Sequence, residues 1–389
     1  MPYLRSGALR LVDAAKGCGQ GMRPVDRPAQ TAYAKGDHHL GRDRHMPNTQ
    51  GFEIAGHSIA PGTRRTVDIP VSTLSDHTPV NLSAHVVHGR RPGPVMFVSA
   101  AIHGDEVIGV EIVRRLLRAA PLRALSGTLL AVPIVNTYGF LNNARYLPDR
   151  RDLNRCFPGG TEGSMASRLA DIFMREIVLR AEIGIDLHSA AVHRTNLPQI
   201  RLTPGNARLA TLGRAFGAPV MLNSKLREGS LRMAAENAGV DVLLYEGGEG
   251  LRFDELAARS GLAGILRVMQ SLGMIGQKGV PRARAATVMC SASRWFRAPA
   301  GGLFRGYLAT GDAVEVGTVL GAITDPFGEA EAEVICDEAG IVIGRSNMPV
   351  VYEGEALFHV ASTLRGEFAA DGVAAQMDAA PLFDEDEIL

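Results

Sequence analysis

Apolar and polar residues recur with two different spacings along the chain, and these spacings predict strands that alternate with helices. Pro94–Ala101 is a continuous apolar run bounded by proline and glycine, which is typical of a strand buried on both faces. Val107–Arg118 then carries apolar residues at helical spacing with arginines on the opposite side. A second buried strand is expected at Thr128–Val135, followed by a loop over Asn136–Gly163.

The same alternation covers most of the chain. Further strands are expected at Thr66–Val71, Leu82–His88, Glu182–Leu187, Gln199–Thr203 and Val240–Tyr245. Further helices are expected at Ser164–Arg180, Asn206–Phe216, Gly229–Gly239 and Phe253–Leu272. Strands and helices in this order predict an α/β fold with a mixed, largely parallel sheet flanked by helices.

The pattern changes near residue 286, where short β-rich runs begin to recur every ~8–12 residues between glycine-containing turns. This pattern predicts a small all-β barrel over residues 286–364. The α/β domain is expected at residues 47–285. Residues 1–46 are polar without a hydrophobic period and are expected to be a disordered extension, and residues 365–389 are expected to be an acidic tail.

Charge and hydropathy exclude several classes of protein. Forty-one Lys and Arg balance forty-one Asp and Glu, so the chain lacks the basic excess of a nucleic-acid-binding protein. The longest apolar runs, Val95–Ile102 and Leu129–Val135, are far shorter than the ~20 residues of a membrane span. Four widely separated cysteines give no disulfide framework and fit a cytoplasmic location. We therefore expect neither nucleic acid nor membrane as a partner.

Two histidines and a glutamate follow buried strands and are candidate metal ligands. His103 and Glu106 come directly after Pro94–Ala101, and His188 follows Glu182–Leu187. The carboxyl ends of parallel strands meet at one edge of a sheet, where ligands bind. Two imidazoles and one carboxylate are a donor set for catalytic Zn²⁺, whereas Mg²⁺ and Ca²⁺ prefer oxygen alone. The alternative is that both histidines only cap loops.

The neighbours of these residues suggest further roles. Asp105 or Asp186 is expected to hold an imidazole N–H of the metal site. Glu246 follows Val240–Tyr245 and precedes two glycines, so it is the best candidate for the general base. Glu249 is its competitor, and a simple surface acid is the alternative for Glu246.

Four arginines lie within an eleven-residue stretch of the loop, Arg145, Arg150, Arg151 and Arg155. Arginines next to rigid proline and glycine suit bidentate capture of a carboxylate. A solvated basic loop is the alternative. A nucleotide phosphate is not expected, because the chain lacks a glycine-rich loop with Lys followed by Ser or Thr.

Taken together and in this order, the segments resemble the succinylglutamate desuccinylase/aspartoacylase family, a deacylase branch of the zinc carboxypeptidase-like hydrolases. The resemblance extends from about Gly51 to Leu272. Four motifs carry it: His103-Gly-Asp-Glu106, Asp152-Leu-Asn-Arg-Cys-Phe-Pro-Gly159, Asp186-Leu-His188 and Tyr245-Glu246-Gly-Gly.

The resemblance implies a zinc carboxypeptidase-like fold with one Zn²⁺ per chain, bound by His103, Glu106 and His188. It implies Glu246 as the general base and Asn154 with Arg155 as the group that holds the substrate carboxylate.

The family also places one arginine at the scissile carbonyl and, in aspartoacylases, another shortly before the base. Arg145 matches the first best, with Arg150 and Arg151 as rivals. Arg232 or Arg227 is available for the second.

The segment from Arg297 to Val360 resembles a biotinyl/lipoyl-type barrel. Such carriers are modified on a lysine, yet no lysine follows Lys278. Cofactor attachment is therefore not expected there. A structural or substrate-capping role is expected instead.

The predicted function is zinc-dependent hydrolysis of the amide bond of an N-acyl amino acid, a small-molecule substrate. A metallocarboxypeptidase acting on small peptides and a non-catalytic ligand-binding relative remain alternatives. The sequence leaves the acyl group, the parent amino acid and homo-oligomer formation open.

Overall fold

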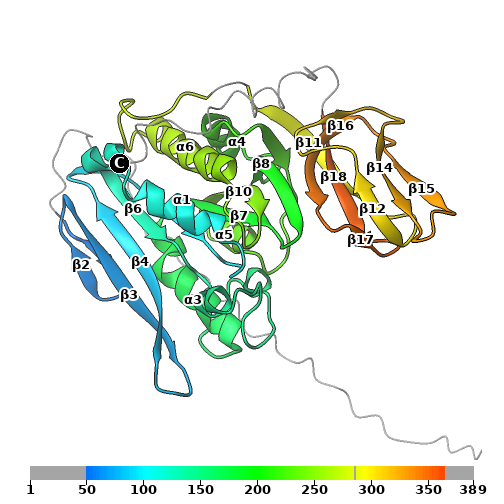
Figure 1. The fold of residues 1–389 in the computed structure, drawn as a ribbon. Coiled ribbons are helices and arrows are strands. Elements are labelled where there is room, and N and C mark those ends of the chain that lie inside the picture. The colour runs from blue at the N-terminus through cyan, green and yellow to red at the C-terminus, as the bar shows by residue number, and fades with distance from the viewer. Residues whose placement is uncertain (1–49, 284–285, 364–389) are drawn as a thin grey trace, which may run out of the picture. The chain divides into compact units, whose positions relative to one another are not determined.

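The computed structural model describes residues 50–283 and 286–363 (Figure 1). The predicted N-terminal extension and the predicted acidic tail lie outside these residues. None of the helices in the described ranges combines the length and apolarity needed to cross a bilayer.

After five consecutive strands over residues 52–100, helices and strands alternate through most of residues 108–271, as the hydrophobic pattern predicts. The strands are β1 (Phe52–Ile54), β2 (His57–Ile59), β3 (Thr63–Thr73), β4 (Pro79–His88), β5 (Arg91–Ala100), β6 (Ser126–Val132), β7 (Ile183–Ala190), β8 (Arg194–Leu202), β9 (Val220–Asn223) and β10 (Asp241–Glu249). The α-helices are α1 (Ile108–Leu116), α2 (Thr137–Leu141), α3 (Met165–Glu176), α4 (Ala207–Phe216), α5 (Leu231–Asn237) and α6 (Glu255–Ser271). Short 3-10 helices cover Ala120–Ala124, Leu153–Arg155 and Val178–Arg180.

Side chains at the helix starts explain several boundaries. Ser164, Asn206, Ser230 and Asp254 each precede a helix and accept a hydrogen bond from a backbone N–H of its first turn. These residue types satisfy an N–H group that has no partner within the helix. The predicted helices at Ser164–Arg180, Asn206–Phe216, Gly229–Gly239 and Phe253–Leu272 are thus confirmed, with slightly shorter bounds.

A mixed sheet forms the centre of this α/β region. Within the described ranges, β6, β5, β7 and β10 lie side by side and are parallel. Strands β4 and β3 continue the sheet antiparallel beyond β6, and β8 is antiparallel to β10. The parallel part of the predicted sheet therefore includes these four central strands, and β9 also pairs parallel with β8.

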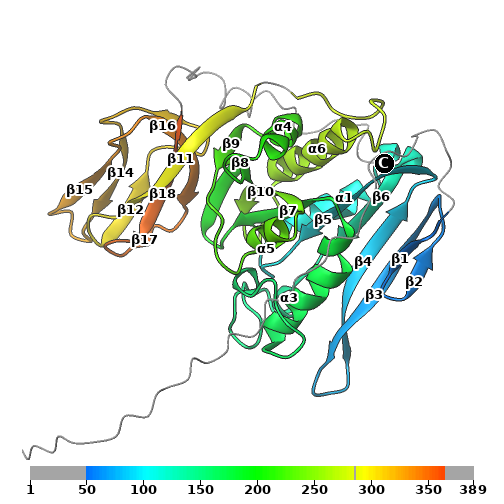
Figure 2. The ribbon, with the colours of Figure 1, turned by 180° about the vertical axis from the view of Figure 1, so that it is seen from behind.

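Helices cover both faces of the sheet (Figures 1 and 2). One core contains buried residues of α1, α4 and α6 together with Met96 and Val98 of β5. The opposite core contains buried residues of α3 and α5 together with Phe97 of β5. Successive β5 residues thus enter opposite cores, which explains why its sequence is apolar without alternation.

Beyond residue 286, the described residues form strands and no helices. They are β11 (Val288–Arg297), β12 (Gly302–Gly306), β13 (Ala313–Val314), β14 (Val319–Thr324), β15 (Glu331–Ile335), β16 (Gly340–Ser346), β17 (Val350–Val351) and β18 (Ala356–Thr363). They form two sheets that share a core, which includes Phe304 of β12 and Phe358 of β18.

One of these two sheets continues the sheet of the α/β region. Strand β11 pairs parallel with β9, and β16 pairs antiparallel with β8. The result is a twelve-stranded sheet over the described residues, and β15, β14, β12 and β17 form a separate four-stranded sheet. The β-rich segment is thus hydrogen-bonded to the α/β region, a connection that the glycine spacing does not predict.

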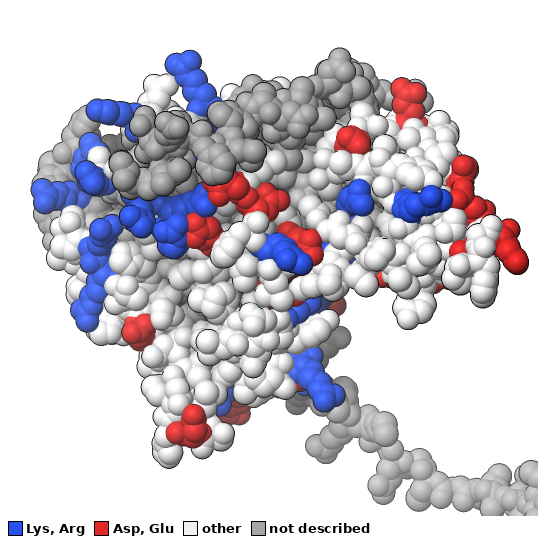
Figure 3. All heavy atoms as spheres, in the orientation of Figure 1, with Lys and Arg blue, Asp and Glu red and all other residues white. Residues whose placement is uncertain are grey.

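Both signs of charge are interspersed on the face shown in Figure 3, in line with the balanced composition.

Candidate active site

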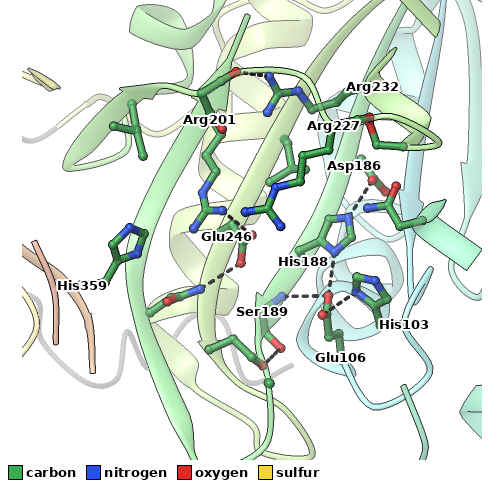
Figure 4. Close-up of a pocket in the computed structure, with 18 of the residues that line it drawn as sticks. His103, Glu106, Asp186, His188, Ser189, Arg201, Arg227, Arg232, Glu246 and His359 are labelled. Carbon is green, nitrogen blue, oxygen red and sulfur yellow. Dashed lines mark hydrogen bonds and ion pairs between the residues drawn. The ribbon is translucent and has the colours of Figure 1, made fainter. Parts of the chain in front are cut away.

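The structure brings His103, Glu106 and His188 together. His103 and Glu106 lie in the turn between β5 and α1, and His188 lies on β7, which pairs parallel with β5. His103 Nδ1 lies 2.6 Å from Glu106 Oε1, and His188 Nδ1 lies 2.7 Å from Glu106 Oε2 (Figure 4). The parallel strand ends therefore meet as the sequence predicts.

All three side chains are buried, and each lies close to a group of opposite charge. Burial by itself raises the pKa of Glu106, but the two imidazoles outweigh it and hold this pKa well below its usual range. Burial by itself lowers the pKa of each imidazole, but carboxylates raise the pKa of His103 and, more strongly, that of His188. The backbone N–H of Ser189 donates a further hydrogen bond to Glu106 Oε2 at 3.2 Å.

The donor set fits a zinc ion. One ligand atom from each of His103, Glu106 and His188 lies within 4.8 Å of the others. The second nitrogen of each imidazole faces a carboxylate: His188 Nε2 lies 2.7 Å from Asp186 Oδ2, and His103 Nε2 lies 3.1 Å from Asp152 Oδ1. A carboxylate on the outer nitrogen fixes the ring and its tautomer, as is usual for zinc-binding histidines.

Of the two candidates from the sequence, Asp186 lies at the outer nitrogen of His188, whereas Asp152 and not Asp105 lies at that of His103. Asp186 is itself held by the hydroxyl of Ser99, which donates to Oδ1 at 2.8 Å. Asp105 Oδ1 is buried without a hydrogen-bond partner among the described residues. Sequence reasoning missed Asp152 because it lies in the arginine-rich loop, 49 positions from His103.

Glu246 lies on β10, the other parallel neighbour of β7. Its Cα is the strand partner of the Cα of His188, so both side chains line the same cavity. Asn196 Nδ2 donates to Glu246 Oε2 at 2.9 Å, and Arg201 Nη1 lies 3.4 Å from Glu246 Oε1. Gly248 has a φ of +74° in the irregular end of the strand.

Glu249, the competing acid, is engaged elsewhere. Its carboxylate accepts hydrogen bonds from the backbone N–H of His193 at 3.0 Å and from Asn347 Nδ2 at 2.9 Å. Glu246 and not Glu249 lines the cavity.

The arginines of the loop separate into two groups. Arg145 and Arg155 line the cavity, whereas Arg150 and Arg151 are exposed and do not. Arg145 Nη1 lies 3.3 Å from Glu106 Oε1, and its Nη2 lies 3.1 Å from Asp152 Oδ2. Burial opposes the charge of Arg145, but the two carboxylates raise its pKa. The structure thus brings Arg145 to the predicted metal ligand Glu106 and does not bring Arg150, a predicted substrate contact, to the cavity.

Two further predicted substrate residues also lie at the cavity. Asn154 is buried and accepts a hydrogen bond from the backbone N–H of Leu231 at 2.9 Å. Arg232 is 7% exposed and donates from Nη2 to the carbonyl of Ser224 at 2.8 Å. Burial, reinforced by the nearby Arg201, lowers the pKa of Arg232 to about 10.

Several residues that line the cavity, whose volume is ≈ 380 Å³, were not predicted from the sequence. Arg201 is one of them and lies beside Glu246, whereas Arg227, one of the two arginines that the sequence offered before the base, also lines the cavity (Figure 4). Trp295 and His359 line it from β11 and β18, and their rings stack at 4.6 Å with an interplanar angle of 11°. Burial, with the charges of Arg201 and Arg227, lowers the pKa of His359 to about 3.

The chain is similar to known proteins over the region that contains most of this cavity. Residues 92–272 match the Succinylglutamate desuccinylase/Aspartoacylase catalytic domain. The chain is 28% identical over 288 residues to the N-alpha-acetyl-L-2,4-diaminobutyric acid deacetylase of Halomonas elongata, an alignment covering 71% of this chain and 84% of that protein.

Solved structures share the fold. A succinylglutamate desuccinylase/aspartoacylase from Rhodobacter sphaeroides superimposes with a TM-score of 0.69 at 26% identity, covering 77% of this chain and 96% of that chain. The product-bound ectoine utilization protein EutE (DoeB) from Ruegeria pomeroyi also has a TM-score of 0.69, at 23% identity, covering 77% of this chain and 95% of that chain. The latter likeness concerns the fold alone.

Proposed function

Because the chain belongs to the succinylglutamate desuccinylase/aspartoacylase family, we propose that it hydrolyses the amide bond of an N-acyl amino acid with Zn²⁺ held by His103, Glu106 and His188. The observation that carries the proposal is the convergence of two imidazoles and one carboxylate beside Glu246 in one cavity. Carboxylates on the outer nitrogens of both histidines support zinc as the metal.

In the proposed reaction, the metal, Glu246 and Arg145 have separate roles. When bound, Zn²⁺ supplies Lewis acidity and brings the pKa of a water molecule to about 7. Glu246 takes one proton from the attacking water and returns a proton to the departing nitrogen. Arg145, whose guanidinium faces Glu106 and Asp152, stabilises the negative charge that develops on the carbonyl oxygen.

Cationic side chains favour an anionic substrate. The cavity is lined by Arg145, Arg155, Arg194, Arg201, Lys225, Arg227 and Arg232, against the acids Glu106, Asp186 and Glu246. A guanidinium holds a carboxylate through two parallel hydrogen bonds, so Arg155 with Asn154, and also Arg232, are suited to carboxylates of the substrate. An amide carrying a free carboxylate is therefore the expected substrate.

The name of the Halomonas elongata relative supports N-acetyl amino acids as the first substrates to test. In that protein's substrate the side chain ends in an amine, which here would face the arginines of the cavity. We therefore include N-acetyl derivatives of acidic, neutral and cationic amino acids, with dipeptides to test a peptidase activity.

The test uses the full-length protein reconstituted with Zn²⁺, and release of free amine is the readout. We expect turnover of N-acyl amino acids and much slower cleavage of dipeptides. Glu246→Gln is expected to bind zinc with unchanged stoichiometry and to lose nearly all turnover, since the amide cannot accept the proton. A zinc-loaded Glu246→Gln protein with wild-type turnover would exclude Glu246 as the base, and faster cleavage of dipeptides would favour the peptidase.

A further inference from the structure

Both oxygens of Glu246 are held from one neighbouring strand. Asn196 and Arg201 lie on β8, which pairs antiparallel with β10. Asn196 donates to Oε2 at 2.9 Å, whereas Arg201 lies farther from Oε1, at 3.4 Å. Asn196 therefore makes the shorter contact and sets the direction of the carboxylate.

Asn196 is in turn held by a strand of the C-terminal segment. It is buried at 7% exposure, and its backbone is the strand partner of Gly344 on β16. The side of β8 opposite β10 is covered by β9 over Gln199–Leu202 and by β16 over Arg194–Asn196. The segment from Gly340 to Ser346 thus lies directly behind the residue that orients Glu246.

Gly344 leaves room for the Asn196 side chain. A Cβ atom at position 344 would lie 2.7 Å from Asn196 Oδ1, closer than two such atoms can approach. The φ of Gly344 is not in the left-handed region, so its backbone does not require glycine. The other two atoms nearest that Cβ position, Thr195 O and His359 Cβ, lie at ordinary contact distances of 3.4 and 3.5 Å. Of the three nearest atoms, only Asn196 Oδ1 would therefore have to move to admit a side chain at position 344.

We propose that β16 is a positioning element of the active site, in which Gly344 admits the Asn196 side chain and Asn196 fixes the orientation of Glu246. This inference rests on the proposed role of Glu246 as the general base. It assigns to the C-terminal segment a part in the reaction, through a residue that the sequence motifs do not include.

The first test removes the hydrogen bond. Asn196→Ala is expected to lower kcat about 10- to 100-fold, the range for a lost hydrogen bond to a charged group, with KM within twofold of wild type. Asn196→Asp keeps the shape but places a second carboxylate beside Glu246, so a larger loss of kcat is expected. Zinc content and melting temperature are measured for both variants, and the zinc content is expected to stay near wild type because Asn196 is not a proposed metal ligand.

The second test asks whether Gly344 acts through Asn196. Gly344→Ala is expected to lower kcat at least threefold, because the end of the Asn196 side chain is the group that must move. In the Asn196→Ala background the same change is expected to alter kcat less than twofold, since its target is gone. Gly301→Ala is the matched control: Gly301 is exposed in the same β-rich segment, and its nearest neighbour to a Cβ is Val351 O at 3.5 Å.

The possible outcomes separate this inference from the proposed function. Equal loss of kcat from Gly344→Ala in both backgrounds, or wild-type kcat in both Asn196 variants, would refute the positioning role. Activity of Glu246→Gln would instead refute the base assignment on which it depends. If Glu246→Gln is inactive and both Asn196 variants are fully active, the proposed function is supported and the positioning role is refuted.

Discussion

Replacing Asp186 by asparagine tests the proposed metal site with a small change of structure. It is 1% exposed, its Oδ2 lies 2.7 Å from His188 Nε2, and its Oδ1 accepts a hydrogen bond from Ser99. Asp186→Asn keeps the volume and removes the negative charge. Water cannot take over the lost contact, because the carboxylate is enclosed. The ring of His188 then loses the charge that fixes its orientation.

The size of the effect follows from the difference between charged and neutral hydrogen bonds. A hydrogen bond to a charged group contributes about 1.5–3 kcal/mol and a neutral hydrogen bond about 0.5–1.5 kcal/mol. Replacing the carboxylate of Asp186 by an amide therefore costs about 1–1.5 kcal/mol. At 1.36 kcal/mol per tenfold change, this weakens zinc binding by about 5- to 15-fold. Loss of ring orientation extends the range to about 100-fold, the upper value for removal of such partners.

Zinc affinity of Asp186→Asn is measured by competition with a chelator at one fixed pH, because protons compete for the two imidazoles. Asp68→Asn is the matched control. The exposed Asp68 side chain lies on β3 and accepts a hydrogen bond from the hydroxyl of Ser83 on β4. A melting curve without metal shows whether the variant is folded. Zinc affinity equal to wild type in a folded Asp186→Asn protein would refute His188 as a ligand oriented by Asp186.

Two further predictions concern the loop arginine and stability in acid. Arg145→Ala is expected to lower kcat about 10²- to 10³-fold in the amine-release assay, as for removal of one oxyanion donor, whereas the exposed Arg151→Ala stays near wild type; equal activities would contradict the assignment. Hydrogen bonds from Arg114 and Arg115 lower the pKa of Glu111 from 4.5 to about 2, so its stabilising contribution is complete above pH 4.5 and is lost as the pH falls toward 2. The free energy of unfolding of Glu111→Gln, from denaturant titrations, should therefore approach that of wild type over this pH range, and a constant difference would contradict the ion-pair explanation.

The convergence of the proposed metal ligands could be predicted from the sequence because their positions follow from strand order. A buried strand such as β5 is apolar throughout, so the polar residues that follow it mark its carboxyl end. Parallel neighbours place these ends at one edge, which is why His103 and His188 meet although 85 positions separate them. Glu246 follows by the same rule from β10.

Apart from Asp186, the residues that hold these groups could not be found in that way. Asp152 reaches His103 from a loop without regular periodicity. The sequence predicted a strand only from Gln199, whereas β8 begins at Arg194, so Asn196 was left outside any element. Trp295 and His359 enter the cavity because β11 pairs with β9 and β16 with β8. Such pairings between distant segments leave no local pattern in the sequence.

The continuous sheet has a consequence for the modularity of the chain. Truncation before β11 would uncover the edge of β9 and the first half of β8, exposing backbone N–H and C=O groups that are now paired. An uncovered edge of this kind promotes aggregation, so the α/β region is poorly suited to independent existence. Recombination that exchanged the C-terminal strands between relatives would have to conserve the pairing surface as well as the chain junction.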